Sequence, residues 1–106
     1  MITEEEIQNI KDQIVSGVRP DRVYLFGSYA SGMQHDESDL DFLVVVSNKE
    51  KSKHALANEV EKNLKLPAAV AKDIIVEYSD RFHRFKNIPY SFIGHIVQTG
   101  KLLYES

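Results

Sequence analysis

Hydrophobic residues recur at helical spacing in the first segment of the chain. The apolar stripe consists of Ile7, Ile10, Ile14 and Val15. Thr3 and Glu6 match a capping box, in which each side chain accepts a hydrogen bond from a free backbone amide of the first turn. We therefore expect a helix over residues 4–16 that ends at Gly17 and is kept from resuming by Pro20.

Three later segments are short, apolar and rich in residues that favour strands. They cover residues 22–26, 39–46 and 71–78. The first contains hydrophobic residues at successive positions, which is typical of a strand covered on both faces. The second has the strongest strand pattern in the chain. A further apolar segment, residues 101–105, could form a terminal edge strand.

Helical patterns lie between and after these strands. We expect a helix over about residues 50–64, capped by Ser47-Asn48 and ended by Leu66-Pro67. A last helix would carry Pro89 in its first turn and end at Gly100. Short helices, turns or loops are expected in the two remaining segments, residues 29–38 and 79–87.

This order of elements predicts the α/β (α+β) class, with a small mixed sheet of about three to four strands and helices packed against it. The length of 106 residues fits a single domain, residues 1–106. Apolar runs stay well below the roughly 20 residues of a membrane-spanning helix, and the acidic N-terminal residues differ from a secretory signal. The chain has no cysteine. We therefore expect a cytoplasmic protein without disulfides or thiolate metal sites.

The charge balance disfavours a nucleic acid as direct substrate. The chain has 13 Lys and Arg against 16 Asp and Glu, a net charge of −3, whereas proteins that neutralise many phosphates usually carry a basic excess. The basic and aromatic run Arg81–Lys86 could contact a triphosphate, RNA or an acidic partner, but a solvated amphipathic segment is the favoured interpretation. The four histidines lack the spacing of zinc ligands.

Three carboxylates occur in strongly apolar surroundings. Asp39 and Asp41 are two positions apart at the start of a predicted strand, so their side chains would point to the same face. Asp73 lies at the start of another strand and could share the site if the two strands are neighbours. Such a cluster suits Mg²⁺, as one ion or two. Alternatively, Asp39 caps its strand, or Asp73 is structural.

Gly27-Ser28 follows the first predicted strand. Glycine lets the backbone approach a ligand closely, and exposed amides with the serine hydroxyl would form an anion site. The alternative for this dipeptide alone is a tight turn. An anion site facing a carboxylate cluster would be suited to phosphoryl or nucleotidyl transfer.

These residues carry a family resemblance. Gly27-Ser28, ten intervening residues and Asp39-Leu40-Asp41 resemble the signature of nucleotidyltransferases related to DNA polymerase β. The local sequence is most similar to the minimal nucleotidyltransferase (MNT) group, whose MntA-like members are antitoxins encoded beside a HEPN toxin. The resemblance implies that Gly27 and Ser28 bind nucleotide phosphates, that Asp39 and Asp41 bind metal, and that Asp73 is the third carboxylate and the base. Relatives often carry a basic residue where this chain has Ser31.

The resemblance also implies an activity. It is the Mg²⁺-dependent transfer of a nucleoside monophosphate, AMP from ATP, to an acceptor hydroxyl, and the acceptor would be a tyrosine of a partner HEPN toxin. Two alternatives stay open: an antitoxin that neutralises its partner by contact without catalysis, and a nucleotidyltransferase acting on a small molecule or RNA. The protein could form a homo-oligomer or a hetero-complex.

Overall fold

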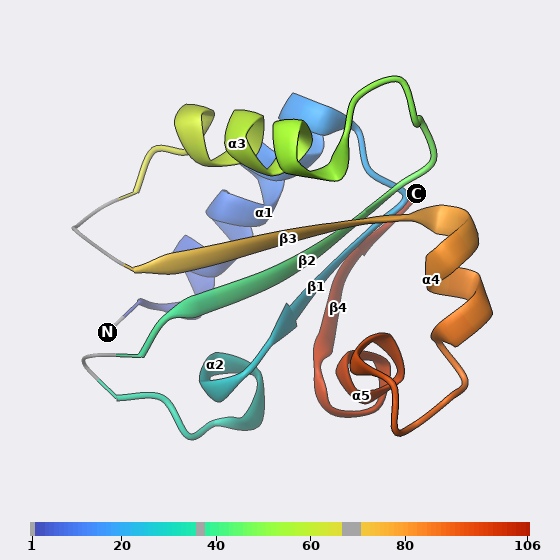
Figure 1. The fold of residues 1–106 in the computed structure, drawn as a ribbon. Helices are drawn as coiled ribbons and strands as arrows, with labels where there is room; N and C mark the ends of the chain where they lie inside the picture. The colour runs from blue at the N-terminus through green and yellow to red at the C-terminus, as the bar shows by residue number, and fades with distance from the viewer. Residues whose placement is uncertain (1, 36–37, 67–70) are drawn as a thin grey trace.

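The middle layer of the molecule is a mixed four-stranded sheet in the order β3-β2-β1-β4 (Figure 1). The computed structural model describes residues 2–35, 38–66 and 71–106. The strands are β1 (Arg22–Phe26), β2 (Leu40–Val46), β3 (Lys72–Tyr78) and β4 (Lys101–Glu105). β1 is antiparallel to both β2 and β4, whereas β2 and β3 are parallel. The predicted mixed sheet and its terminal edge strand are confirmed.

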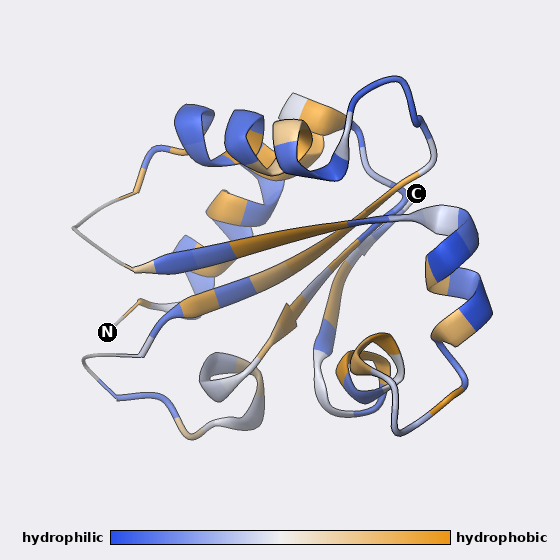
Figure 2. Ribbon diagram, in the orientation of Figure 1, coloured by the Kyte–Doolittle hydropathy of each residue, from blue (hydrophilic) through white to orange (hydrophobic). Residues whose placement is uncertain are grey.

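Helices cover both faces of this sheet. They are α1 (Glu4–Val18), α2 (Ser28–Ser31), α3 (Lys53–Asn63), α4 (Ser79–Phe85) and α5 (Phe92–Thr99). α1 and α3 pack on one face, and α4 and α5 pack on the other (Figure 1). Phe42 and Val44 of β2 face α1 and α3, whereas Leu43 and Val45 face α4 and α5. Successive side chains of a strand alternate between faces. The continuous apolar run of β2 therefore contributes side chains to two hydrophobic cores, one on each face of the sheet (Figure 2).

α1 begins as predicted and ends later. The Glu6 amide donates to the Thr3 hydroxyl (3.1 Å) and the Thr3 amide donates to the Glu6 carboxylate (2.9 Å), which confirms the capping box. The expected end at Gly17 is wrong, because the helix continues to Val18 and Arg19 adopts a left-handed conformation with φ 49°. Arg19 precedes proline, and a residue in that position is disfavoured in the helical region.

The predicted start of α3 is also wrong. Ser52 caps this helix by accepting a hydrogen bond from the Ala55 amide at 3.0 Å. Asn48 instead accepts from the Glu50 amide at 2.8 Å, a local turn typical of asparagine. The helix ends at Asn63, before the expected break at Leu66-Pro67, and Pro67 lies outside the described residues.

α5 begins after Pro89 rather than around it. Ser91 is the N-cap and accepts from the Gly94 amide at 2.9 Å. Gly100 ends the helix as predicted, with its amide donating to the Ile96 carbonyl at 2.7 Å. None of the helices in the described ranges has both the length and the apolar character needed to cross a membrane.

Candidate active site

Two of the predicted carboxylates lie side by side on neighbouring strands. Asp41 of β2 is the register partner of Asp73 of β3 in the parallel ladder. Their side chains therefore leave the same face of the sheet, the face that Leu43 shares with α4 and α5. Figure 2 shows the polar start of β3 beside the polar break near the start of β2. Asp73 was expected to share the site only if its strand lies next to the strand of Asp41. β2 and β3 are neighbours, so the structure brings Asp41 and Asp73 together.

Asp39 also belongs to this group, because its negative charge acts on Asp41. β2 begins at Leu40, so Asp39 precedes the strand, instead of opening it as predicted, and its side chain is exposed. The pKa of Asp41 is raised, first because partial burial removes water from the carboxylate, and then because of the negative charges of Asp73 and Asp39. The three carboxylates therefore form one electrostatic cluster centred on Asp41.

Gly27 lies directly against this cluster. Phe26 is the register partner of Asp41 across the antiparallel pair, and Gly27 follows it. Gly27 has φ 76° and ψ −151°, a conformation that is essentially restricted to glycine. A side chain at position 27 would overlap Oδ2 of Asp41 and lie 3.4 Å from its Cγ. Glycine therefore allows the turn after β1 to touch the Asp41 carboxylate.

Ser28 is the first residue of α2, which follows this turn. The amides of Ala30 and Ser31 both donate to the Gly27 carbonyl at 3.1 Å. The amides of Ser28 and Tyr29 have no partner within such a short helix, nor one elsewhere among the described residues. Tyr29 itself is buried, and its hydroxyl accepts from the Ile2 amide at 3.1 Å, in keeping with a packing role. The turn thus offers free backbone donors close to Asp41.

The carboxylates fit a hard cation in an open site. Among the described residues, no group of three or more histidine, aspartate or glutamate side chains is arranged to hold a metal ion unaided. Mg²⁺ commonly uses one or two protein carboxylates and completes its shell with water and substrate phosphates. Asp41 with Asp73 or Asp39 supplies such a partial oxygen donor set. The pKa of Asp41 is raised by burial first and then by the charges of Asp73 and Asp39, and a bound cation would offset both effects.

The basic run Arg81–Lys86 lies away from the carboxylates. α4 follows the far end of β3 (Figure 1), and Ser79 is six positions beyond Asp73, or about 20 Å along a strand. Arg81 pairs with Glu77 at 2.9 Å, and Phe82 is fully buried. This placement supports a solvated amphipathic helix and argues against contact with a triphosphate bound at Asp41.

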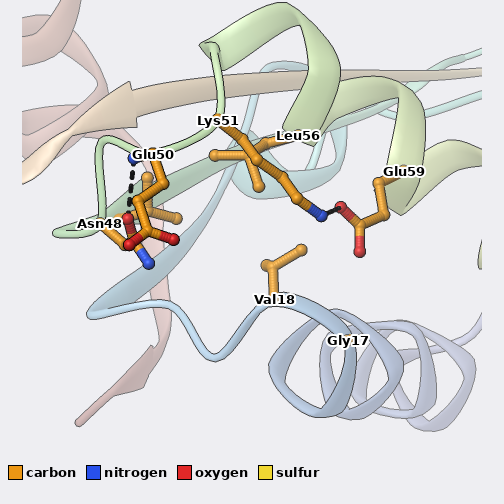
Figure 3. Close-up of a pocket in the computed structure, with 8 residues that line it drawn as sticks. Gly17, Val18, Asn48, Glu50, Lys51, Leu56 and Glu59 are labelled. Atoms are coloured by element: carbon orange, nitrogen blue, oxygen red, sulfur yellow. Dashed lines mark hydrogen bonds and ion pairs between the residues drawn. The ribbon is translucent and has the colours of Figure 1, made fainter.

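Two cavities differ in their relation to this site. One of about 180 Å³ lies between α1 and α3 at the opposite end of the sheet, where the Lys51–Glu59 ion pair spans 2.9 Å (Figure 3). The other, of about 280 Å³, adjoins the cluster, and we call it the Gly27 cavity. It is lined by Phe26, Gly27, Ser31, His95 and Thr99. His95 and Thr99 of α5 were not predicted from the sequence as site residues. Their spacing of four residues places them on one face of a helix, but it does not show which part of the protein that face packs against.

A mixed sheet with paired carboxylates beside a Gly-Ser turn is the arrangement of a nucleotidyltransferase. The chain belongs to the polymerase β nucleotidyltransferase family, since residues 8–106 match the family described as "Polymerase beta, Nucleotidyltransferase". The resemblance carried by the Gly-Ser and Asp-Leu-Asp motifs is therefore confirmed at the level of the family.

Individual relatives agree with this assignment. The chain is 34% identical over 83 residues to "Putative protein adenylyltransferase MJ0604" of Methanocaldococcus jannaschii, covering 78% of this chain and 77% of that protein. It shares its fold with the crystal structure of a "putative nucleotidyltransferase" from Sulfolobus solfataricus, with TM-score 0.64, 23% identity and coverage of 95% and 78% of the two chains. A crystal structure of a toxin–antitoxin with AMP-PNP matches with TM-score 0.55, 22% identity and coverage of 93% and 73%.

Replacing Gly27 with alanine should damage the site and the fold together. We expect a loss of about 1–3 kcal/mol of stability from the disfavoured backbone conformation, and loss of activity because the new methyl group displaces the Asp41 carboxylate. Gly32→Ala is the matched control: Gly32 also has a positive φ, 77°, but a methyl group there meets nothing within 4 Å. Denaturant unfolding and nucleotidyl transfer rates measure both effects. Equal activity in the two variants would contradict the contact with Asp41.

Proposed function

We propose that this nucleotidyltransferase transfers AMP from ATP to a hydroxyl group of a protein, with Mg²⁺ bound by the carboxylate cluster. The observation that carries the proposal is the contact between the Gly27 turn and Asp41, with Asp73 as the register partner of Asp41. This contact supports the proposal because it brings free backbone amides, which could bind phosphate, close to carboxylates suited to Mg²⁺. The relative from Methanocaldococcus jannaschii, which is named a putative protein adenylyltransferase, supports a protein acceptor.

The proposed roles follow from these positions. The amides of Ser28 and Tyr29, with the Ser28 hydroxyl, would hold the phosphates. Asp39 and Asp41 would be the main ligands of the metal, and Asp73 would complete the carboxylate set beside it. When bound, Mg²⁺ would neutralise phosphate charge and lower the pKa of the acceptor hydroxyl. Asp73 accepts the proton of that hydroxyl, whose oxygen forms a bond to the α-phosphorus. The bond from the α-phosphorus to the β-bridging oxygen breaks, and pyrophosphate leaves.

The acceptor we propose is a tyrosine of a HEPN-type toxin, which makes this chain the antitoxin of the pair. The local Gly-Ser and Asp-Leu-Asp sequence supports this partner, and the fold shared with a toxin–antitoxin structure is consistent with it. Asp73 is exposed at the edge strand β3. A folded protein could therefore present a side chain to it without a separate acceptor-binding domain.

Intact mass of the partner tests this function. We expect incubation with ATP, Mg²⁺ and this protein to increase the partner's mass by one or more AMP units, and peptide analysis to place the addition on tyrosine. Omission of Mg²⁺ should prevent the change. If the partner is neutralised without any change in mass, the protein is a non-catalytic antitoxin. Labelling of RNA or of a small hydroxyl compound instead would identify a different acceptor.

A further inference from the structure

The Gly27 cavity shares a wall with the proposed phosphate site. Gly27 contacts the Asp41 carboxylate and also lines the cavity. Phe26, on the same face as its register partner Asp41, forms the adjoining wall. α2 and α5 flank this end of β1 (Figure 1). A molecule whose phosphates lie at Gly27 could therefore extend directly into the cavity.

The size of the cavity suits a small ring system. Its volume of about 280 Å³ lies just below the range of about 300–1,000 Å³ for pockets that take drug-sized ligands. A nucleoside fits this description, whereas a folded protein or a duplex does not. The size therefore favours part of the nucleotide over part of a macromolecule.

The walls of the cavity offer both stacking and hydrogen bonding. Phe26 is half-buried and packs edge-to-face against Phe92 with ring centroids 5.7 Å apart, and His95 adds an exposed ring from α5. Aromatic rings at such a wall are suited to stack on a base.

Two hydroxyl groups add a preference for hydrogen-bond donors. Thr99 Oγ1 donates to the His95 carbonyl at 2.8 Å, and Ser31 Oγ donates to the Ser28 carbonyl at 3.2 Å. With their protons engaged, both hydroxyl oxygens keep lone pairs that could accept hydrogen bonds from a ligand. Ribose hydroxyls and the amino group of a base are donors of the matching kind. Ser31, where relatives often carry a basic residue, would thus contact the nucleoside rather than the phosphates.

We propose that the Gly27 cavity binds the nucleoside moiety of the triphosphate, with His95 and Thr99 of α5 as specificity-determining residues. This inference rests on the proposed function, since it takes the phosphates to lie at the Gly27 turn. It leaves the β3 side of the cluster, where Asp73 is exposed, for the acceptor. The nucleoside and the acceptor would then reach the α-phosphate from opposite sides of Asp41.

Comparison of ATP with inorganic tripolyphosphate tests the assignment, since only ATP carries the nucleoside. Calorimetric titration in the presence of Mg²⁺ would compare the unmodified protein with His95→Ala and Thr99→Val. We expect each variant to weaken ATP binding by up to about tenfold, through lost stacking for His95→Ala and a lost hydrogen bond for Thr99→Val, and to leave tripolyphosphate binding within twofold. His54→Ala is the control, because His54 is an exposed histidine of α3, on the other face of the sheet.

Three outcomes would overturn the inference. Unchanged ATP affinity with slower transfer would assign the cavity to the acceptor, and equal weakening of both ligands would assign it to phosphates. Equal affinity of the unmodified protein for ATP and tripolyphosphate, with transfer intact, would reject the nucleoside site while the proposed function stands. If the unmodified protein binds ATP more tightly than tripolyphosphate but transfers nothing to any acceptor, the proposed function is wrong, whereas the nucleoside site stands.

Discussion

Replacing Asp41 with asparagine should abolish nucleotidyl transfer while the fold survives. Asparagine keeps the shape of the side chain, so the contact with Gly27 can persist. It removes the charge at the centre of the carboxylate cluster, and we expect a fall in rate of about 10³-fold, as for the loss of a preorganised electrostatic group. Rates with saturating ATP and Mg²⁺ measure the effect. Asp12→Asn, at an exposed position of α1, is the matched control and should keep full activity.

The same substitution should stabilise the metal-free protein. The pKa of Asp41 is raised in the folded state above the ordinary value of 3.8, so the folded protein binds this proton more tightly than the unfolded chain does. Its contribution to stability is therefore fully present below pH 3.8 and is lost as the pH rises through the raised pKa. We expect Asp41→Asn to unfold at a higher temperature than the unmodified protein at neutral pH, with a smaller difference at acid pH.

For the activity of the same variant, near-normal Mg²⁺-dependent transfer in the folded protein would contradict the assignment of Asp41 as a metal ligand.

Asp73→Asn should separate catalysis from binding. If Asp73 acts mainly on the acceptor proton, the variant should bind Mg²⁺–ATP with a Kd within a few fold of normal. Its turnover should fall by about 10²–10⁴, the range for loss of a general base. Calorimetric titration with Mg²⁺–ATP and single-turnover rates on the same preparations would measure the two quantities.

Asp39→Asn is the informative comparison for Asp73. Asp39 adds charge next to Asp41, so its removal should weaken binding of the metal–nucleotide complex and activity together. If Asp73→Asn loses binding as strongly as Asp39→Asn does, Asp73 is an ordinary metal ligand. Full activity of Asp73→Asn would make that residue structural.

Local features of the sequence were sufficient for the main elements and for the family. The Thr3 capping box depends only on residues three positions apart, and it forms as predicted. The short apolar run of β1 predicts a strand covered on both faces, and its side chains do contribute to both cores. The spacing of Gly27-Ser28 and Asp39-Leu40-Asp41 was enough to indicate the nucleotidyltransferase family, which the family match confirms.

Element boundaries were less predictable, because alternative caps compete over a few residues. Gly17 could end α1, but a proline two residues after the helix imposes the end at Val18 instead. Ser47-Asn48 and Ser52 are all capable N-caps, and the helix that packs against the sheet starts at the later one.

The tertiary structure alone decided which distant residues share the site. Asp41 and Asp73 are register partners because β3 lies next to β2 in parallel, and a shift by one residue would turn either side chain to the other face. His95 and Thr99 reach the Gly27 cavity because α5 packs across the end of β1. Capping and periodicity act between near neighbours in the chain, whereas strand order and helix docking are set by burial of apolar surface between segments far apart in sequence.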